Sequence, residues 1–192
     1  MQTEQKILEA AYHCFMNFGY SATSIVMIGK YADVSRFTVH NYFKNKEEVF
    51  RAVVKDYGEC AKKQCMEISE VNNPVWQQIQ QATEIWFAPI FKEPIDQIVF
   101  SELSDVIDKY ADDIRDDHNR FLFDLFNEKL AKADLAGEIK LSNLGKSAED
   151  VAKFLATSIH CIKSDIDVNY MAEYIEQLVS VYRVATQPQQ SY

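Results

Sequence analysis

Three residues near the N-terminus, Gly29, Asp33 and Val34, have the spacing that the turn of a helix-turn-helix motif requires. Two helices that cross closely need a small side chain at their contact, and Gly29 supplies it. At Asp33 the chain must reverse, often with positive φ, and aspartate is among the side-chain-bearing residues that adopt this region most readily. Val34 would then fill the small core behind the turn. The spacing therefore predicts two short helices that cross at Gly29.

Helix-capping residues flank this turn on both sides. Thr23 can cap the helix before the turn, and Ser35 can cap a short helix after it that is expected to end near Tyr42. Asn45 and Glu48 have the spacing of a capping box for a longer helix that runs to about residue 70. An earlier helix is predicted from apolar residues at helical spacing that end at a glycine: Ile7, Leu8, Ala11, Phe15 and Gly19.

The rest of the chain also follows helical periodicity, without the alternation typical of strands. Only 5 glycines and 4 prolines among 192 residues argue against an all-β chain, which needs many tight turns. Further helices are predicted at residues 75–88, 94–109, 111–132, 147–163 and 168–186, with a loop at residues 133–146. The sequence therefore predicts an all-α fold of about nine helices.

The distribution of charge separates the first 55 residues from the rest of the chain. Although the net charge is −9, the first 55 residues hold seven basic and five acidic side chains and so carry +2. The remaining residues carry −11. A mildly basic head on an acidic body would orient the head toward a polyanion, although solubility alone explains the acidity equally well.

The first 54 residues resemble the DNA-binding head of the TetR (tetracycline-repressor) family of bacterial regulators. The resemblance rests on the patterns IL.AA...F...GY..TSI..I, from Ile7 to Ile28, and A.VS..TV..YF.NKEEVF, from Ala32 to Phe50. It implies three head helices, a fourth connecting helix and an all-helical body. We therefore expect a helix-turn-helix DNA-binding domain at 1–46, a ligand-binding and dimerisation domain at 47–186, and a frayed tail at 187–192.

The resemblance makes residues 36–42 the recognition helix, which would enter a groove of a double-stranded DNA operator. Thr38 matches the family's threonine, and Tyr42 and Lys46 match positions that commonly hold the DNA backbone. Arg36 and Asn41 have side chains that can read the edges of guanine and adenine. The expected DNA contacts are Ser24, Arg36, Phe37, Thr38, His40, Asn41, Tyr42 and Lys46.

Phe37 and His40 depart from the family pattern. Phe37 replaces a frequent glycine or other small residue, and either presses against a thymine methyl group or packs inward on a neighbouring aromatic ring. His40 stands where the family usually has tyrosine; it either contacts DNA over a shorter reach or is an ordinary exposed histidine. Operator preference therefore cannot be borrowed from relatives.

Aromatic residues are concentrated in the middle of the chain. At helical spacing they form either an ordinary core or a ligand pocket, and periodicity alone leaves both possibilities open. The family senses small molecules in this region, so the resemblance implies a pocket for a small apolar or aromatic effector, with His118 or Tyr110 as polar groups. The expected lining residues are Trp86, Phe87, Phe91, Phe100, Tyr110, His118, Phe121 and Phe126.

The last two predicted helices carry apolar faces that are wider than packing within one domain requires. In the family the paired C-terminal helices form a four-helix dimer interface. The resemblance therefore implies a homodimer on a roughly palindromic operator, released from DNA by its effector. The expected interface residues are Phe154, Leu155, Ile159, Ile162, Ile175, Leu178, Val179 and Tyr182.

The sequence lacks the motifs of helical enzymes. It contains no HExxH, no paired ExxH, no nucleophile elbow and no glycine-rich phosphate loop, so we expect neither enzymatic activity nor a cofactor. The segment DDIRDDH at residues 112–118 could hold a metal through Asp113, Asp116 and Asp117, but a solvated acidic face is favoured and no metal is expected.

Two further expectations concern location and an alternative function. The four cysteines lack metal-ligand spacing, and neither a signal segment nor an 18-residue apolar run is present, which predicts a cytoplasmic protein with no membrane partner. The alternative to a repressor is a helical module that binds a ligand or a protein and has lost operator binding.

Overall fold

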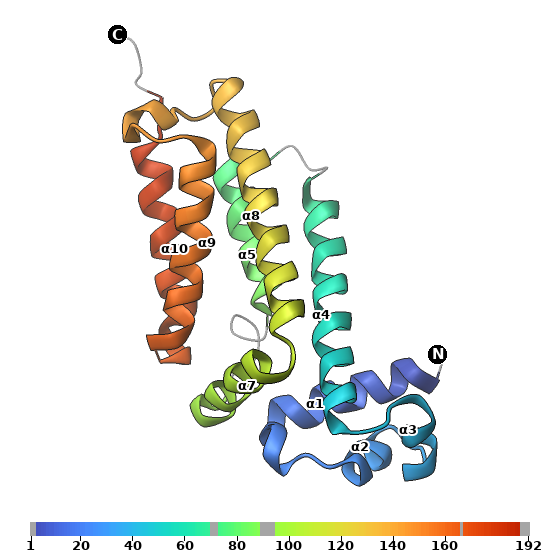
Figure 1. Ribbon diagram of the computed structural model, residues 1–192. Coiled ribbons are helices and arrows are strands. Elements are labelled where there is room, and N and C mark those ends of the chain that lie inside the picture. Colours follow the sequence, from blue (N-terminus) through green and yellow to red (C-terminus); the bar gives the residue numbers. More distant parts are fainter. Residues whose placement is uncertain (1–2, 70–72, 89–94, 166, 189–192) are drawn as a thin grey trace. The chain divides into compact units, whose positions relative to one another are not determined.

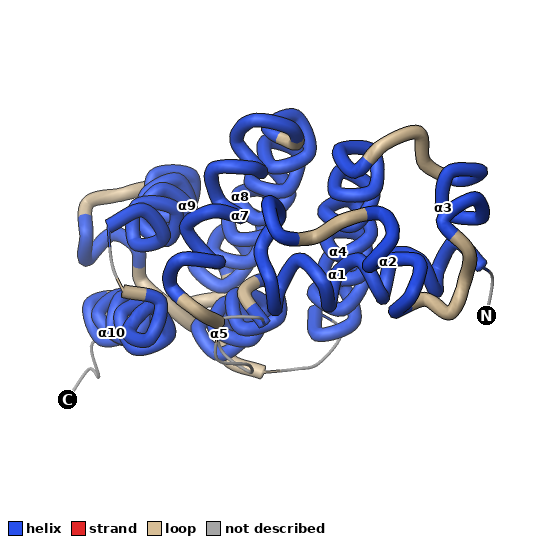
Figure 2. The backbone as a smooth tube through the Cα atoms, turned by 90° about the horizontal axis from the view of Figure 1, so that it is seen from below, coloured by secondary structure: helices blue, strands red, loops and turns tan. Residues whose placement is uncertain are grey.

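The computed structural model describes residues 3–69, 73–88, 95–165 and 167–188, with the backbone alone for residues 69 and 160–165. These residues form nine α-helices and one short 3-10 helix, and they contain no strand (Figures 1 and 2). The all-α prediction is confirmed. The elements are α1 (Thr3–Ala22), α2 (Ile25–Tyr31), α3 (Arg36–Tyr42), α4 (Lys46–Ser69), α5 (Val75–Trp86), α7 (Gln97–Tyr110), α8 (Asp112–Leu135), η1 (Leu141–Leu144), α9 (Ala148–Asp165) and α10 (Val168–Ala185).

The chain divides into two compact units. Unit 1 comprises Met1–Cys60 and Ile95–Asp116, and unit 2 comprises Ala61–Pro94 and Asp117–Tyr192. The division differs from the predicted boundary at residue 46, because α7 packs against α1 within unit 1. The functions expected for residues 1–46 and 47–186 stay predictions. Among the described helices, none is long and apolar enough to cross a membrane.

The turn in unit 1 has the geometry that the sequence predicts. Asp33 has a φ of 53° and is the one described residue other than glycine with a positive φ. The backbone N–H of Val34 donates to the carbonyl oxygen of Gly29 at 2.9 Å. A Cβ atom on Gly29 would lie 3.0 Å from the carbonyl oxygen of Val34. The absence of a side chain at Gly29 therefore allows the close approach that joins α2 to α3.

The N-cap of α2 is Ser24, so the prediction of Thr23 is wrong by one residue. The Ser24 Oγ accepts the backbone N–H of Met27 at 3.2 Å. Thr23 is buried instead, and its hydroxyl donates to the carbonyl oxygen of Gly19 at 2.7 Å. Because the Thr23 hydroxyl is hydrogen-bonded to the end of α1, it does not accept a backbone N–H at the start of α2. Thr23 therefore fixes the end of α1 and leaves the cap of α2 to Ser24.

The caps of α3 and α4 are as predicted. The Ser35 Oγ accepts the N–H of Thr38 at 2.9 Å, and the Asn45 Oδ1 accepts the N–H of Glu48 at 2.8 Å. The Glu48 carboxylate reaches back to the N–H of Lys44, one residue before the cap, rather than to the cap residue itself. Local chemistry thus sets where both helices begin.

The apolar core of unit 1 joins the head helices to α7. Leu103 of α7 is buried among residues of α1 to α4, and Val99, Val106 and Ile107 of the same helix pack around it. The other large buried members of this core are Ile7, Leu8, Phe15, Ile28, Val39, Phe43, Val49, Phe50 and Val53.

A hydrogen bond from α1 to Glu102 reinforces this apolar packing. Gly19 has a φ of 79° and interrupts the regular helical path of α1. Just beyond it, the backbone N–H of Ser21 donates to the Glu102 carboxylate of α7 at 2.8 Å. This hydrogen bonding lowers the pKa of the Glu102 carboxyl group, so the charged form is held at the end of α1.

Lys46, the first residue of α4, holds the same end of α1 through its ammonium group. The Nζ atom donates to the carbonyl oxygens of Tyr20 at 2.7 Å and Thr23 at 2.9 Å. It also lies 4.2 Å from the centroid of the Tyr20 ring. Burial lowers the pKa of the Lys46 ammonium, and the Glu102 carboxylate opposes that shift. We call Glu102 and Lys46 the α1 clamp.

Unit 2 has a second apolar core, formed by α5, α8, α9, α10 and the end of α4. A buried hydrogen bond from the indole Nε1 of Trp76 to the Oγ1 of Thr186, 2.8 Å long, crosses this core. Lys129 is also buried, and its ammonium donates to the Oε1 of Gln78 at 2.6 Å. The largest apolar members of the core include Trp76, Ile79, Trp86, Phe87, Phe126, Leu130, Leu155, Ile159, Ile175 and Val179.

Replacing Gly19 by alanine should destabilise unit 1 by more than the roughly 1–3 kcal/mol that a side chain costs in a glycine-only conformation. The added Cβ would overlap the Glu102 carboxylate. Gly137→Ala is the matched control, because Gly137 has a φ of 74° but a Cβ added there would meet no atom within 4 Å. Urea unfolding of the full chain measures both losses. Equal losses of unfolding free energy in the two variants would contradict the clash. So would a Gly19→Ala loss that stays the same size when Glu102 is also replaced by alanine.

Replacing Lys46 by methionine should lower the free energy of unfolding by about 1–3 kcal/mol, because two partly buried carbonyl groups lose a charged donor. Lys44→Met is the control, since the Lys44 side chain is 87% exposed and pairs with Glu48 only at 3.8 Å. Circular dichroism during urea unfolding gives both values. Two small and equal changes would show that the α1 clamp contributes nothing to stability.

Candidate functional site

The third helix is anchored to the head by its central residue. Val39 is fully buried in the core of unit 1, while the Ser35 hydroxyl caps the start of the helix and lies 2.8 Å from the Thr38 hydroxyl. The backbone N–H of Phe43, which ends the helix, donates to the carbonyl oxygen of Val39 at 3.0 Å. With one side fixed in this way, α3 presents the opposite side to solvent (Figure 2).

The solvent-facing residues of α3 belong to the set that the resemblance implies. Successive residues turn by 100° around an α-helix, so residues two positions from Val39 point about 200° away from it. Phe37 and Asn41 occupy those two positions. The exposed side chains of α3 are Arg36, Phe37, His40, Asn41 and Tyr42.

Phe37 does not pack inward on a neighbouring ring. Its exposed fraction is 76%, the largest among the apolar residues of the head. Of the two alternatives left open by the sequence, inward packing is therefore wrong, and the ring is available to a partner. Beside it, the Arg36 Nε donates to the His40 Nε2 at 3.4 Å, which orients both side chains along the same flank.

Three of the expected DNA-contacting residues also have roles within the head. Ser24 caps α2, and its hydroxyl keeps a proton that it can donate to a phosphate. Thr38 is partly buried beside Ser35. Lys46 directs its ammonium at two carbonyl groups of the α1 clamp, a role that sequence reasoning missed. Whether these residues contact DNA stays a prediction.

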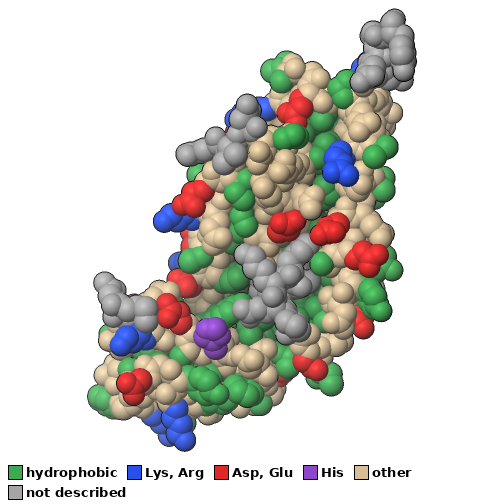
Figure 3. Space-filling view, turned by 180° about the vertical axis from the view of Figure 1, so that it is seen from behind, with side chains coloured by type: hydrophobic (Ala, Val, Ile, Leu, Met, Phe, Trp, Pro, Cys, Tyr) green, Lys and Arg blue, Asp and Glu red, His purple; other side chains and the backbone are tan. Residues whose placement is uncertain are grey.

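The electrostatic surroundings of α3 suit an anionic partner. The helix contains no acidic residue, and Lys30 and Lys44 are exposed near its two ends in the sequence. Asp33 in the turn and Glu47 at the start of α4 are exposed carboxylates on the flanking segments. Elsewhere, acidic and basic side chains are interspersed over the face drawn in Figure 3, where neither sign forms a single patch.

The residues expected to line an effector pocket are divided between the two units. Phe100 and Tyr110 belong to unit 1, where the Tyr110 ring lies 5.7 Å from that of Tyr20. Phe91 lies outside the described residues. The other five belong to unit 2: Trp86, Phe87, His118, Phe121 and Phe126.

Three of these unit 2 residues form one ring cluster. Trp86 stacks on Phe121 with centroids 5.5 Å apart, and the His118 ring meets the Trp86 ring edge-on at 5.4 Å. Phe126 is completely buried, Trp86 and His118 are buried at 8% exposure, and Phe121 is half-buried. The Trp86 cluster, as we call Trp86, His118 and Phe121, is the part of the predicted lining that the structure brings together.

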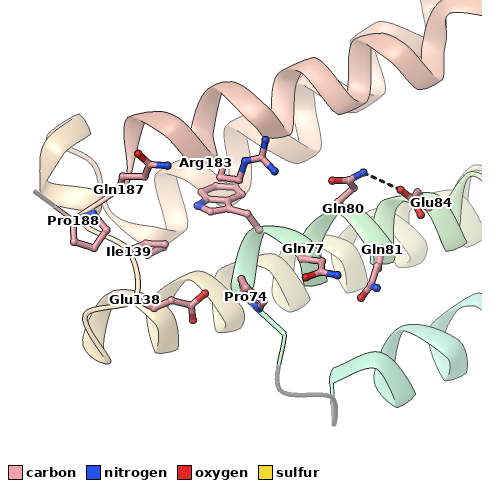
Figure 4. Close-up of a pocket in the computed structure, with 11 residues that line it drawn as sticks. Pro74, Gln77, Gln80, Gln81, Glu84, Glu138, Ile139, Arg183, Gln187 and Pro188 are labelled. Atoms are coloured by element: carbon pink, nitrogen blue, oxygen red, sulfur yellow. Dashed lines mark hydrogen bonds between the residues drawn. The ribbon is translucent and has the colours of Figure 1, made fainter. Parts of the chain in front are cut away.

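A different cavity of about 580 Å³ lies between α5 and α10, and none of the predicted lining residues contributes to it. In Figure 4 a polar stripe along α5 lines this cavity together with Arg183 of α10 and Gln187, which follows the end of that helix. The stripe could have been recognised from its helical spacing: Gln77, Gln80, Gln81 and Glu84. Its Gln80 Nε2 already donates to the Glu84 Oε1 at 3.0 Å.

The aspartates that could have suggested a metal site are each paired with a cation. Both Asp113 carboxylate oxygens accept from the Arg51 guanidinium at 2.8 Å. Asp117 lies 2.6 Å from the Lys62 ammonium, and Asp116 pairs with Arg115 at 2.9 Å. These partners lower the pKa values of Asp113 and Asp117. The three side chains therefore act in separate ion pairs.

Half of the residues predicted for the dimer interface are buried within unit 2, and whether the eight residues contact a second copy stays a prediction. Four of the named residues are at most 3% exposed, so they have little surface left for a partner: Leu155, Ile159, Ile175 and Val179. Leu178 and Tyr182 are half-buried, whereas Phe154 is 59% exposed. The side chain of Ile162 lies outside the described residues.

The exposed apolar residues of α10 lie along one stripe of the helix. The sequence alone did not separate this stripe from the apolar face that packs in the core. The exposed residues recur three, four and seven positions apart, so they share one side of the helix. On α9, Phe154 is also exposed, and its ring meets the half-buried Tyr182 ring edge-on with centroids 6.3 Å apart. We call these residues the α10 stripe: Tyr170, Tyr174, Val181 and Val184.

Comparison with known proteins agrees with the arrangement of the head. Residues 7–53 match the sequence model of the family described as "Bacterial regulatory proteins, tetR family". The chain is 36% identical over 76 residues to an uncharacterized HTH-type transcriptional regulator, YhgD, of Bacillus subtilis strain 168. That match spans 40% of this chain and 40% of the length of the relative.

Solved structures extend the likeness of fold to the whole chain. The reduced form of NemR from E. coli has a TM-score of 0.75 at 14% identity, covering 99% of this chain and 100% of NemR. SmeT, the repressor of the Stenotrophomonas maltophilia multidrug efflux pump SmeDEF, has a TM-score of 0.66 at 18% identity, covering 95% and 91%. Residues 7–53 are therefore similar to the TetR family of bacterial regulatory proteins, and the chain as a whole shares the helical fold of these solved structures.

Proposed function

We propose that this chain is a DNA-binding transcriptional repressor that a small apolar or aromatic effector releases from a palindromic operator. The observation that carries the proposal is the outward face of α3, where Arg36 and Asn41 are exposed and Val39 is buried. Arginine and asparagine side chains can each make paired hydrogen bonds to base edges in the major groove. We place the protein in the cytoplasm, where it meets chromosomal DNA.

The α10 stripe supports the proposal that two copies associate. Its exposed apolar side chains would be removed from water by a second copy of the same surface, as a two-fold interface requires. Two recognition helices related by two-fold symmetry read two half-sites in opposite orientations. A homodimer therefore accounts for the palindromic operator in the proposal.

The Trp86 cluster is the part of unit 2 that we assign to the effector. Stacked aromatic rings with one histidine match the composition of small-molecule sites, which are mostly apolar with few polar groups. SmeT, a relative in fold, has been solved in complex with triclosan at a TM-score of 0.68 to this chain. By analogy we propose an apolar or aromatic effector here.

The proposed signal passes along continuous helices. Both α4 and α8 begin in unit 1 and end in unit 2, and Arg51 of α4 pairs with Asp113 of α8 inside unit 1. An effector that shifts the unit 2 part of either helix would therefore also move the part of that helix that belongs to unit 1. Release from DNA requires that the effector favour the displaced state.

The alternative is a helical binding module without an operator. It requires that the exposed face of α3, with Arg36, Phe37 and Asn41, does not contact DNA. A mobility-shift screen with DNA flanking the protein's own gene separates the two functions. We propose a regulator rather than an enzyme under either alternative.

Arg36→Ala should weaken binding to the cognate operator by roughly 5- to 150-fold and relax the base preference at one position per half-site, because a bidentate contact is lost. Arg120→Ala, which removes an exposed arginine from α8 in unit 2, is the control and should bind as the wild type does. Fluorescence anisotropy with operator and scrambled duplexes measures both effects. If the Arg36→Ala variant kept the affinity and the base preference of the wild type, α3 would not be the helix that enters the groove.

Val181→Glu should convert the homodimer to monomers at micromolar concentration, because a carboxylate would be placed on the α10 stripe. Leu135→Glu is the matched control, since Leu135 is 92% exposed at the end of α8 and lies outside the stripe. Light scattering coupled to size exclusion gives the mass of each variant. A dimeric Val181→Glu protein would show that the interface lies elsewhere.

A further inference from the structure

The centre of the outward face of α3 combines one apolar ring with one amide. Phe37 and Asn41 are one helical turn apart, and side chains with this spacing are neighbours on a helix surface. Both point away from the buried Val39, so they lie at the middle of the face rather than at its edges. We call them the Phe37–Asn41 pair.

Three other polar residues of α3, Arg36, Thr38 and His40, are engaged beside this pair. The Arg36 Nε donates to the His40 Nε2 on one flank, and the Thr38 hydroxyl meets that of Ser35 at 2.8 Å. The Asn41 amide makes no hydrogen bond within the described part of the chain, so both its donor and its acceptor are available. Phe37 is 76% exposed and gains most by leaving water.

The two members of the pair match two features that an A·T base pair shows in the major groove. Adenine presents an N7 acceptor and an N6 donor, which suit the two ends of an asparagine amide. Thymine presents a 5-methyl group, and this is the apolar group of the four bases that a side chain can contact there. A phenyl ring cannot hydrogen-bond to base edges, so any base preference that it confers must come from such a contact.

We infer that Phe37 is a specificity-determining residue that selects thymine through its 5-methyl group, beside an adenine contacted by Asn41. The inference rests on the proposed DNA binding and adds to it the chemistry of one operator position. Each half-site then contains an A·T pair opposite the centre of α3. An operator lacking a thymine at that position is bound more weakly, although every phosphate contact is retained.

Uracil in place of thymine tests this directly, because the substitution deletes the methyl group and leaves the hydrogen-bonding edge unchanged. Duplexes are first selected from a random-sequence pool with the full chain in the absence of effector. In the best duplex each dT is then replaced by dU, one position at a time, and affinities are measured by fluorescence anisotropy. The wild type should lose about three- to tenfold in affinity at one thymine per half-site.

Phe37→Ala supplies the second arm. This variant should bind the thymine duplex about as weakly as the wild type binds the uracil duplex, and should no longer distinguish the two. Its fold should be unaffected, because the ring is exposed, and an unchanged unfolding midpoint verifies this. Phe18→Ala is the matched control: Phe18 is an exposed aromatic of α1, 41% exposed, and its loss should leave the discrimination against uracil intact.

The outcomes separate the inference from the function on which it rests. A wild type that tolerates uracil at every position, or a Phe37→Ala variant that keeps the full discrimination, overturns the role of Phe37 while leaving DNA binding in place. Failure of the pool to yield any preferred duplex contradicts sequence-specific DNA binding itself, and the inference with it. Discrimination that is lost in Phe37→Ala and kept in Phe18→Ala supports both.

Discussion

The approach of Gly29 to the carbonyl group of Val34 is the contact on which the presentation of α3 depends. Any larger residue at position 29 would push the turn away, since its Cβ would already lie 3.0 Å from that oxygen. The same turn requires a positive φ at Asp33, a conformation that aspartate tolerates at modest cost. With the turn closed, Val39 reaches the core of unit 1, and the opposite face of the helix is left for a partner.

The α1 clamp gives the head a second constraint, and it joins α7 to the head rather than to unit 2. Because Gly19 has no side chain, the Glu102 carboxylate can accept the N–H of Ser21 at the end of α1. Lys46 completes the arrangement with two hydrogen bonds to carbonyl groups of the same segment. Under the proposed function, an effector that displaced α7 would therefore disturb the packing of the head directly.

The features that the sequence predicted correctly depend on chemistry between near neighbours. Ser35 and Asn45 bond to backbone groups three residues away, and Asp33 adopts its φ because of the turn in which it stands. The features that it did not predict depend on distant partners. Thr23 looks like a helix cap, and the hydrogen bonds of Lys46 to backbone carbonyl groups cannot be foreseen, until α1 is placed beside them.

The body shows the same limit. Helical periodicity reveals that α9 and α10 carry wide apolar faces, but it cannot tell which part of each face the chain itself covers. Leu155 and Ile175 proved to be core, whereas Tyr174 and Val181 remain at the surface. The aromatic residues in the middle of the chain are divided between the two units for a related reason. Because α7 packs against α1, its aromatic residues belong to unit 1, whereas the others belong to unit 2.

Photochemical crosslinking from position 37 tests the central claim, that the outward face of α3 contacts DNA, most directly. Benzoylphenylalanine replaces Phe37 in one protein and Phe154, an exposed residue of α9, in another, and each is irradiated with duplex DNA that flanks the protein's own gene. The account predicts a protein–DNA crosslink from position 37 and none from position 154. Absence of a crosslink from position 37, or equal capture from both positions, would contradict it.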